Sequence, residues 1–247
     1  MAVYDEIGRR YARHRRADHR FAEPVWRALG DARLVLNVGA GTGSYEPARA
    51  AVSTVAVEPS AVMLAQRGPG TAPAVQAVAE ALPFPGEVFD AVMAFLTVHH
   101  WTDPRAGLAE LTRVAPRRVV VGYDVALHNS LWLIDDYLPE LAERESRRSL
   151  SVEQIADAVG ADRIDALPIP HDCTDGLTVA YWRRPEAFLD PDVRACCSGL
   201  AQADQSVVAR AIGRLQDDLR TGRWHERHGE LLQLDQLDFG LRLIVAG

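Results

Sequence analysis

The sequence predicts an α/β fold built on a doubly wound, mostly parallel sheet of seven strands, with a helical insertion before the last strand. Three observations support this prediction. An apolar strand over residues 33–38 runs directly into glycines, a second over 53–57 ends at an acid, and the apolar stretch Leu241–Ala246 follows a long helical segment. Strands that are apolar without alternation are typical of parallel sheets covered by helices on both faces.

The first part of the chain alternates predicted strands and helices. Residues 1–29 are expected to form an N-terminal helical cover, because apolar side chains recur there at helical spacing. Asp103-Pro104 is typical of a helix N-cap with proline in the first turn, and Ser151–Gln154 is a capping-box pattern. The cofactor-binding α/β core is expected over residues 30–170. Its strands are predicted at 33–38, 53–57, 74–78, 89–96, 117–123 and 163–169, and its helices from about 45, at 60–67, from 104 and at 152–159.

The last part of the chain departs from this alternation. Residues 171–238 separate the sixth predicted strand from the seventh, which lies within residues 239–247 and is expected to close the sheet. Helices are predicted in this insertion at about 190–201 and 204–220. We expect the insertion to be a substrate lid over the carboxyl edge of the sheet. A helical buttress and a dimer surface are the alternatives.

Composition narrows the classes of function. The net charge of −7 argues against a non-specific nucleic-acid binder, which usually carries a basic face. All 27 basic residues are arginines, which excludes a Walker lysine and a lysine nucleophile or base. No apolar run approaches the roughly 18 residues of a membrane span, and the N-terminus lacks the apolar core of a signal peptide. We therefore expect a cytoplasmic protein without a membrane or nucleic-acid partner. The oligomeric state, a dimer included, stays open.

The cysteines predict neither a disulfide framework nor a metal site. Cys173, Cys196 and Cys197 are an odd number, and two of them are adjacent. No C-x-x-C pair is present, which argues against a structural zinc site. No metal is expected.

The glycines after the first strand indicate a ligand loop. They lie at 39, 41 and 43, where a backbone free of side chains can approach a ligand closely. The dinucleotide fingerprint G-x-G-x-x-G would require a glycine at position 44, which is occupied by Ser44. Glu58 ends the second strand, where nucleotide-binding α/β folds grip ribose hydroxyls. A tight turn without a ligand is one alternative. A nicotinamide-dependent oxidoreductase is disfavoured by Ser44 and by the absence of any Tyr-x-x-x-Lys pair.

In these residues the chain resembles the class I S-adenosylmethionine-dependent methyltransferases, especially the type 11 small-molecule branch. The resemblance covers roughly residues 30–125. The residues that carry it are Leu36–Gly43, Val57–Ser60, Ala79–Phe84, Phe89–Ala91 and His99–Trp101. It implies a Rossmann-like methyltransferase fold, S-adenosyl-L-methionine as cofactor, and methyl transfer to an oxygen, nitrogen or carbon atom of a small molecule. The alternative is a non-methylating S-adenosylmethionine-binding protein, a partner subunit or an enzyme of another reaction on the same fold.

The resemblance also implies which residues contact the cofactor. The glycine loop would hold the methionine portion, Glu58 the ribose, and the turn over 79–81 the adenine. Arg15 would pair with the cofactor's carboxylate, and Tyr11 would cover the sulfonium. The chain departs from the family at Asn37 and Val78, where many relatives carry acids. The full expected set is Tyr11, Arg15, Gly39, Ala40, Gly41, Glu58, Pro59, Met63, Ala79, Glu80, Ala81, Phe95 and Leu96.

Candidate catalytic residues follow the fourth strand. His99 and His100 are the candidate general bases, because histidine has a suitable pKa and open parallel sheets place chemistry at this edge. The alternative is that this pair only packs around the cofactor. The candidates for contact with the substrate are His128, Trp132, His171 and Asp172.

Overall fold

The computed structural model describes residues 4–8, 15–47 and 51–247. Its centre is a seven-stranded sheet of order β3-β2-β1-β4-β5-β9-β6. The strands are β1 Leu34–Val38, β2 Ser53–Val57, β3 Ala74–Val75, β4 Ala91–Phe95, β5 Arg117–Tyr123, β6 Arg163–Ala166 and β9 Leu241–Ala246. β1 to β5 pair in parallel, whereas β9 is antiparallel to both β5 and β6. The predicted α/β sheet is therefore confirmed, although the last strand lies between β5 and β6 and not at the edge.

Helices cover both faces of the sheet, as the uninterrupted apolar strands require. The helix α2, His19–Ala28, packs Phe21 and Val25 into a core shared with one face of the strands. On the other face, α4 (Pro104–Val114) and α7 (Val152–Val159) pack in a second core. The two cores take alternate residues of β1, because successive side chains of a strand point to opposite faces.

The predicted helix caps are confirmed. The Asp103 side chain accepts hydrogen bonds from two backbone N–H groups of the first turn of α4. Ser151 and Gln154 form a capping box at the start of α7, and Gly160 ends that helix in the left-handed region, with φ +64°. Such caps satisfy backbone groups that a helix terminus leaves without an intrahelical partner.

Several predicted elements are shorter or divided. Turns follow β1 at residues 41–46, where a helix was expected from about 45; residues 48–50 lie outside the described part. The expected helix over 60–67 is reduced to α3, Ala61–Leu64. The expected strand over 163–169 divides into β6 and β7, because prolines at 168 and 170 cannot donate to a ladder. β7, Ile169–Pro170, pairs instead with β8, Gln236–Leu237, in a two-stranded sheet.

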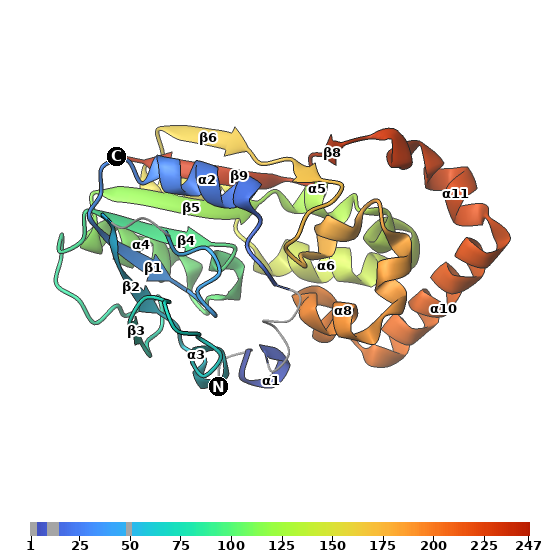
Figure 1. The fold of residues 1–247 in the computed structure, drawn as a ribbon, viewed down its shortest axis with the longest axis horizontal. Helices are drawn as coiled ribbons and strands as arrows, with labels where there is room; N and C mark the ends of the chain where they lie inside the picture. Colours follow the sequence, from blue (N-terminus) through green and yellow to red (C-terminus); the bar gives the residue numbers. More distant parts are fainter. Residues whose placement is uncertain (1–3, 9–14, 48–50) are drawn as a thin grey trace.

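A helical lobe lies beyond the carboxyl ends of the parallel strands (Figure 1). We define it as residues 125–148 and 171–235. Its helices are α5 Val125–Asn129, α6 Pro139–Arg148, α8 Pro191–Cys196, α9 Ser198–Ala201, α10 Gln205–Thr221 and α11 Arg223–His228, with a π-helical turn Leu133–Tyr137 and 3₁₀ turns Thr178–Tyr181, Pro185–Leu189 and Gly229–Gln233. The predicted helix over 190–201 is thus interrupted at Cys197, whose backbone is extended. The lobe's interior is aromatic, with Trp132 packed between Phe188 and Trp224.

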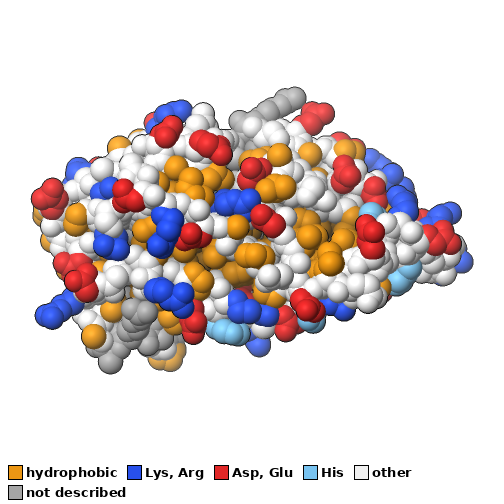
Figure 2. Space-filling model, turned by 90° about the horizontal axis from the view of Figure 1, so that it is seen from above, with side chains coloured by type: hydrophobic (Ala, Val, Ile, Leu, Met, Phe, Trp, Pro, Cys, Tyr) orange, Lys and Arg blue, Asp and Glu red, His pale blue; other side chains and the backbone are white. Residues whose placement is uncertain are grey.

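The surface carries mixed charge. On the face shown in Figure 2, acidic and basic side chains lie interspersed among apolar ones. None of the helices that the structure describes is long and apolar enough to cross a membrane.

Candidate functional site

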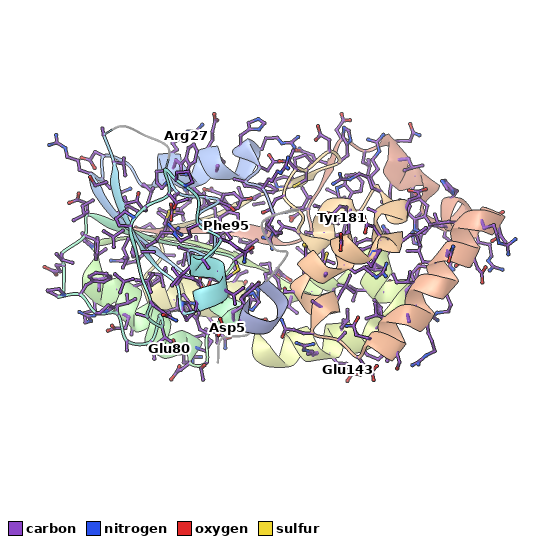
Figure 3. All side chains as sticks on the ribbon, turned by 60° about the horizontal axis from the view of Figure 1, so that its bottom comes forward. Asp5, Arg27, Glu80, Phe95, Glu143 and Tyr181 are labelled. Atoms are coloured by element: carbon purple, nitrogen blue, oxygen red, sulfur yellow. The ribbon has the colours of Figure 1, made fainter. Side chains whose placement is uncertain are left out.

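Two pockets lie where the carboxyl edge of the sheet meets the helical lobe. The first, which we call the loop pocket, has a volume of about 460 Å³, part of it open to solvent, and is lined mainly by the end of β1 and the residues after it. The second, the lobe pocket, encloses about 1060 Å³, part of it open to solvent, and lies against α6, α8 and α9. Arg15 and Leu96 line both pockets. In Figure 3, Phe95 at the end of β4 lies between sheet and lobe, with Tyr181 on the lobe side.

The glycine loop has a conformation that requires glycine. Gly39, Gly41 and Gly43 have φ values of +68°, +54° and +89°, which L side chains rarely adopt. A Cβ on Gly39 would lie 2.0 Å from Oγ1 of Thr97, so no side chain fits there. The N–H of Gly39 donates to the carbonyl of Val57 (2.8 Å), which ties the loop to the end of β2.

A buried ion pair packs against the glycine loop. Arg67 donates to the carbonyl of Gly41 (3.1 Å) and pairs with Glu46 at 2.5 Å. The side chains of Arg67 and Glu46 are only 6% and 9% exposed. Sequence reasoning did not assign either residue, because nothing in their spacing marks them as partners.

Glu58 lies at the end of β2, as expected, and faces the glycine loop. Its two carboxylate oxygens accept hydrogen bonds from the backbone N–H groups of Gly41 (2.8 Å) and Ser60 (2.9 Å). Burial raises the pKa of Glu58, and the two backbone bonds oppose that rise. Each oxygen keeps a lone pair with which it can accept a further hydrogen bond.

Arg15 joins the loop pocket to the helical lobe. Its guanidinium donates to both carboxylate oxygens of Asp175, at 2.5 and 3.4 Å, and the two side chains are 11% and 1% exposed. Tyr45 donates its hydroxyl to the same carboxylate (2.7 Å) and stacks on Phe95 with ring centroids 3.6 Å apart. The sequence marked Asp175 only as part of a polar cluster with His171 and Asp172 at the mouth of the insertion. Its pairing with Arg15, 160 residues away, was not predicted, and neither was the role of Tyr45.

The short helix α1, Tyr4–Ile7, lies across the edge of the sheet. The hydroxyl of Tyr4 is 3.0 Å from Nε2 of His100, and Ser60 donates its hydroxyl to Asp5 (2.7 Å). Asp5 is labelled on this helix in Figure 3. The N-terminal segment therefore contacts the ends of both β2 and β4.

Imidazole and phenol rings form one wall of the lobe pocket. The rings of His99 and His100 have centroids 3.8 Å apart, and Tyr123 lies 5.0 Å from His99 and 4.6 Å from His128. Within the part of the chain that the structure describes, Nδ1 of His128 is buried and has no hydrogen-bond partner. Burial lowers the pKa of His128 to about 4, so this ring is neutral at pH 7.

Some expected site residues lie elsewhere. Trp132 is 3% exposed in the interior of the lobe, where its Nε1–H donates to the carbonyl of Trp182 (2.8 Å). Asp172 pairs with Arg20 on the surface, and the neighbouring His171 lines neither pocket. The structure thus brings His128 to the pocket with His99 and His100 but does not bring Trp132, His171 or Asp172 there.

The expected cofactor residues divide in the same way. Glu80 accepts hydrogen bonds from the N–H groups of Thr102 and Asp103. Met63 lies beneath the loop, 3.2 Å from where a Cβ on Gly41 would be. Tyr11 lies outside the described residues. Of the expected set, those that line the loop pocket are Arg15, Gly39, Ala40, Gly41, Phe95 and Leu96; Glu58, Pro59, Met63, Ala79, Glu80 and Ala81 do not.

Comparisons with known proteins agree with this geometry. A family model described as a methyltransferase domain matches residues 36–118. The chain is 30% identical to a candidate methyltransferase from an antibiotic biosynthesis pathway of Anabaena variabilis ATCC 29413. The match covers 95% of this chain and 99% of that one, with a TM-score of 0.87. The chain belongs to the class I S-adenosylmethionine-dependent methyltransferases, type 11.

More distant structures share the methyltransferase fold. The [4+2]-cyclase SpnF is 18% identical, with 92% of this chain and 80% of that chain covered and a TM-score of 0.52. Geranyl diphosphate C-methyltransferase from Streptomyces coelicolor A3(2), solved with S-adenosyl-L-homocysteine, is 14% identical, with 92% and 77% covered and a TM-score of 0.50. No curated protein matches the chain.

The residues of the loop pocket fit the cofactor that this family implies. The loop offers backbone without side chains at Gly39 and Gly41. The charged side chains that line the pocket in the described part are Arg15 and Asp175, a cation and an anion that match a zwitterionic amino-acid group. Glu58 supplies buried acceptor oxygens beside the loop. In the described residues, no group of three or more His, Cys, Asp or Glu could hold a metal ion.

Proposed function

We propose that this protein transfers the methyl group of S-adenosyl-L-methionine to a small molecule bound in the lobe pocket. The observation that carries the proposal is that the two pockets meet at Arg15 and Leu96. A donor in the loop pocket and an acceptor in the lobe pocket would therefore face each other across one boundary. Such positioning accounts for much of the rate of a group transfer.

The backbone at this boundary supports the proposal. Leu96 has φ +49°, a conformation that costs about 1–3 kcal/mol in a residue other than glycine. Its N–H donates to the carbonyl of Val121 (2.8 Å), which holds the strained residue in place. Backbone strain of this kind is concentrated at functional sites.

Each group of residues has a stated role. The cofactor, when bound, supplies an activated methyl group. Gly39, Ala40 and Gly41 would contact the methionine portion of the cofactor. Glu58 would accept hydrogen bonds from its ribose hydroxyls. Arg15 would bind its carboxylate and would remain paired with Asp175. We further propose that the insertion over 171–238 acts as a lid, because residues 196–200 and Gln202 form a wall of the lobe pocket.

Proton removal, where the acceptor requires it, would fall to the imidazoles of the lobe pocket. His99 and His100 lie three and four residues after Leu96 and are the imidazoles nearest to the boundary in sequence. We expect His99→Ala and His100→Ala to slow turnover by about 10²–10⁴-fold if the replaced residue is the base. The affinity for S-adenosylhomocysteine should stay unchanged. Full turnover in both variants would exclude a base at this pair.

Calorimetric titration tests the function. Purified protein should bind S-adenosylmethionine and S-adenosylhomocysteine at micromolar strength and should not bind NAD. Transfer of a labelled methyl group to co-purified metabolites should then be detectable. Binding of both sulfur ligands without methyl transfer would favour a non-methylating member of the fold, and failure of both to bind would refute the proposal.

A further inference from the structure

Basic side chains line the lobe pocket of this acidic protein. The chain carries 34 acidic residues and a net charge of −7. None of the described residues that line the lobe pocket is Asp or Glu, whereas two are arginines and three are histidines. An excess of basic side chains in a pocket of an acidic protein indicates selection of an anionic ligand.

The two arginines differ in their partners. Arg15 is neutralised by the buried carboxylate of Asp175. Arg144, on α6, donates from Nη2 to the amide oxygen of Gln202 at 2.6 Å, and this oxygen is uncharged. Among the residues that the structure describes, no carboxylate lies within 4.0 Å of the Arg144 guanidinium. Arg144 is therefore a half-buried cation without a matching anion in the described part of the protein.

This lack of an anion has an energetic consequence. A guanidinium that is partly withdrawn from water loses hydration, and a neutral amide oxygen replaces only part of it. A ligand oxyanion could bind the remaining N–H donors in the paired geometry that arginine favours. The cost of burying Arg144 would then be recovered on binding.

The surroundings of Arg144 set the rest of the ligand's character. Leu141 lies on α6, one turn before Arg144. Leu200 lies on α9, between Ser198 and Gln202. All of these residues line the pocket. The amide of Asn129 donates to the carbonyl of Ala142 (3.3 Å), which joins α6 to the helix that carries His128. The pocket thus offers a cation and an apolar wall on α6 and α9, next to the row of imidazoles.

We propose that the methyl acceptor is an amphiphilic small molecule with an oxyanion group that binds Arg144 beside Gln202. Its apolar body would lie against Leu141 and Leu200, and its nucleophile would reach the imidazole row. A carboxylate, a sulfonate and a phosphate ester share the chemistry that this site recognises. The inference rests on the proposed function, because it names the class of acceptor for the same pocket.

A pair of fluorescent dyes tests the anion site without any methyl transfer. Anilinonaphthalene sulfonate and the uncharged N-phenylnaphthylamine share an apolar body and differ in the sulfonate group. Each dye is titrated into the wild-type protein, Arg144→Gln and the control Arg27→Gln. Arg27 lies on α2 (Figure 3) and lines neither pocket, and its side chain is 77% exposed. Circular dichroism and calorimetry with S-adenosylhomocysteine show that each variant is folded and retains the loop pocket.

The proposal predicts a loss that is specific to charge. Arg144→Gln should weaken binding of the sulfonate dye by about 10- to 100-fold, the effect of a hydrogen-bonded charge pair. Binding of the uncharged dye should stay unchanged, and Arg27→Gln should change neither. The proposal is overturned if the wild-type protein does not bind the sulfonate dye more tightly than the uncharged one, or if Arg144→Gln keeps that preference. Failure of S-adenosylhomocysteine to bind would instead refute the proposed function and leave the dye result to stand on its own.

Discussion

The loop pocket and the lobe pocket are built in different ways, although they share a boundary. The loop pocket depends on backbone conformation within a short stretch, with positive φ at three glycines and hydrogen bonds between adjacent strands. The lobe pocket is assembled from side chains of α1, the end of β4, α5, α6, α8 and α9, which are far apart in the sequence. The glycine loop of the first pocket is fixed by local geometry, whereas the walls of the second are fixed by packing between distant segments.

This difference explains how one fold can serve many acceptors. Glycine-loop geometry tolerates little change, because a side chain at Gly39 would meet Thr97. The walls of the lobe pocket come from helices that can change sequence without altering the sheet. The ion pair of Arg15 with Asp175 lies where the two pockets meet. Substitutions at this pair should therefore have the largest effect on the protein.

Loss of Asp175 should have the largest effect. Asp175→Ala removes the partner of the nearly buried Arg15 and the acceptor for the Tyr45 hydroxyl. We expect the free energy of unfolding to fall by about 3–5 kcal/mol, measured by urea denaturation. The control Asp217→Ala removes half of an exposed pair with Arg220 and should cost about 0–1 kcal/mol. Equal effects in the two variants would show that the connection between the pockets is not structural.

Two glycine-to-alanine substitutions compare the strained backbone of the glycine loop with the regular backbone of a helix. Gly39→Ala should destabilise the protein by at least about 1–3 kcal/mol, because it combines φ +68° with a clash at Thr97. Gly213→Ala places a methyl group in open space within α10 and should stabilise by about 0.5–1 kcal/mol. The melting temperatures should therefore move in opposite directions. A tolerated Gly39→Ala would contradict the geometry of the loop.

Glu58 and Glu80 are both predicted cofactor residues, and we expect their replacement to have different effects on cofactor binding. Glu58→Ala should weaken S-adenosylhomocysteine binding by about 1–3 kcal/mol, the cost of lost charged hydrogen bonds. Glu80 already accepts from Thr102 and Asp103, so Glu80→Ala should lower stability by about 1 kcal/mol and leave the affinity unchanged. Calorimetry on both variants decides this. A similar loss of affinity at Glu80 would support its predicted role at the adenine.

The smallest effect concerns His128 and pH. Burial lowers the pKa of this ring to about 4, below the usual value of about 6.5 in the unfolded chain. Between these values only the unfolded state takes up the proton, so stability falls as the pH falls. The wild-type protein should lose on the order of 1 kcal/mol more than His128→Phe between about pH 7 and about pH 5.5. The same loss in both proteins, followed by urea denaturation, would mean that His128 is not buried as a neutral ring.

Several features followed from the sequence alone, because they depend on neighbours along the chain. Apolar β1 ending in three glycines specifies a strand and a loop with positive φ, and both are present. The caps of α4 and α7 were also readable, since a cap involves side chains within three residues of the bonds that they make. The position of Glu58 needed one further step, the parallel pairing of β1 with β2, which brings the end of β2 beside the loop.

Only the tertiary structure decided which distant side chains meet. Trp132 and His128 follow the same strand, yet the lobe buries Trp132 against Phe188 and Trp224 and leaves His128 at the pocket. The pairing of Arg15 with Asp175 joins residues 160 positions apart. The wall formed by Arg144 and Gln202 depends on how α6 packs near α9. Sequence periodicity reports which face of an element is apolar, but packing between elements determines which residues share a pocket.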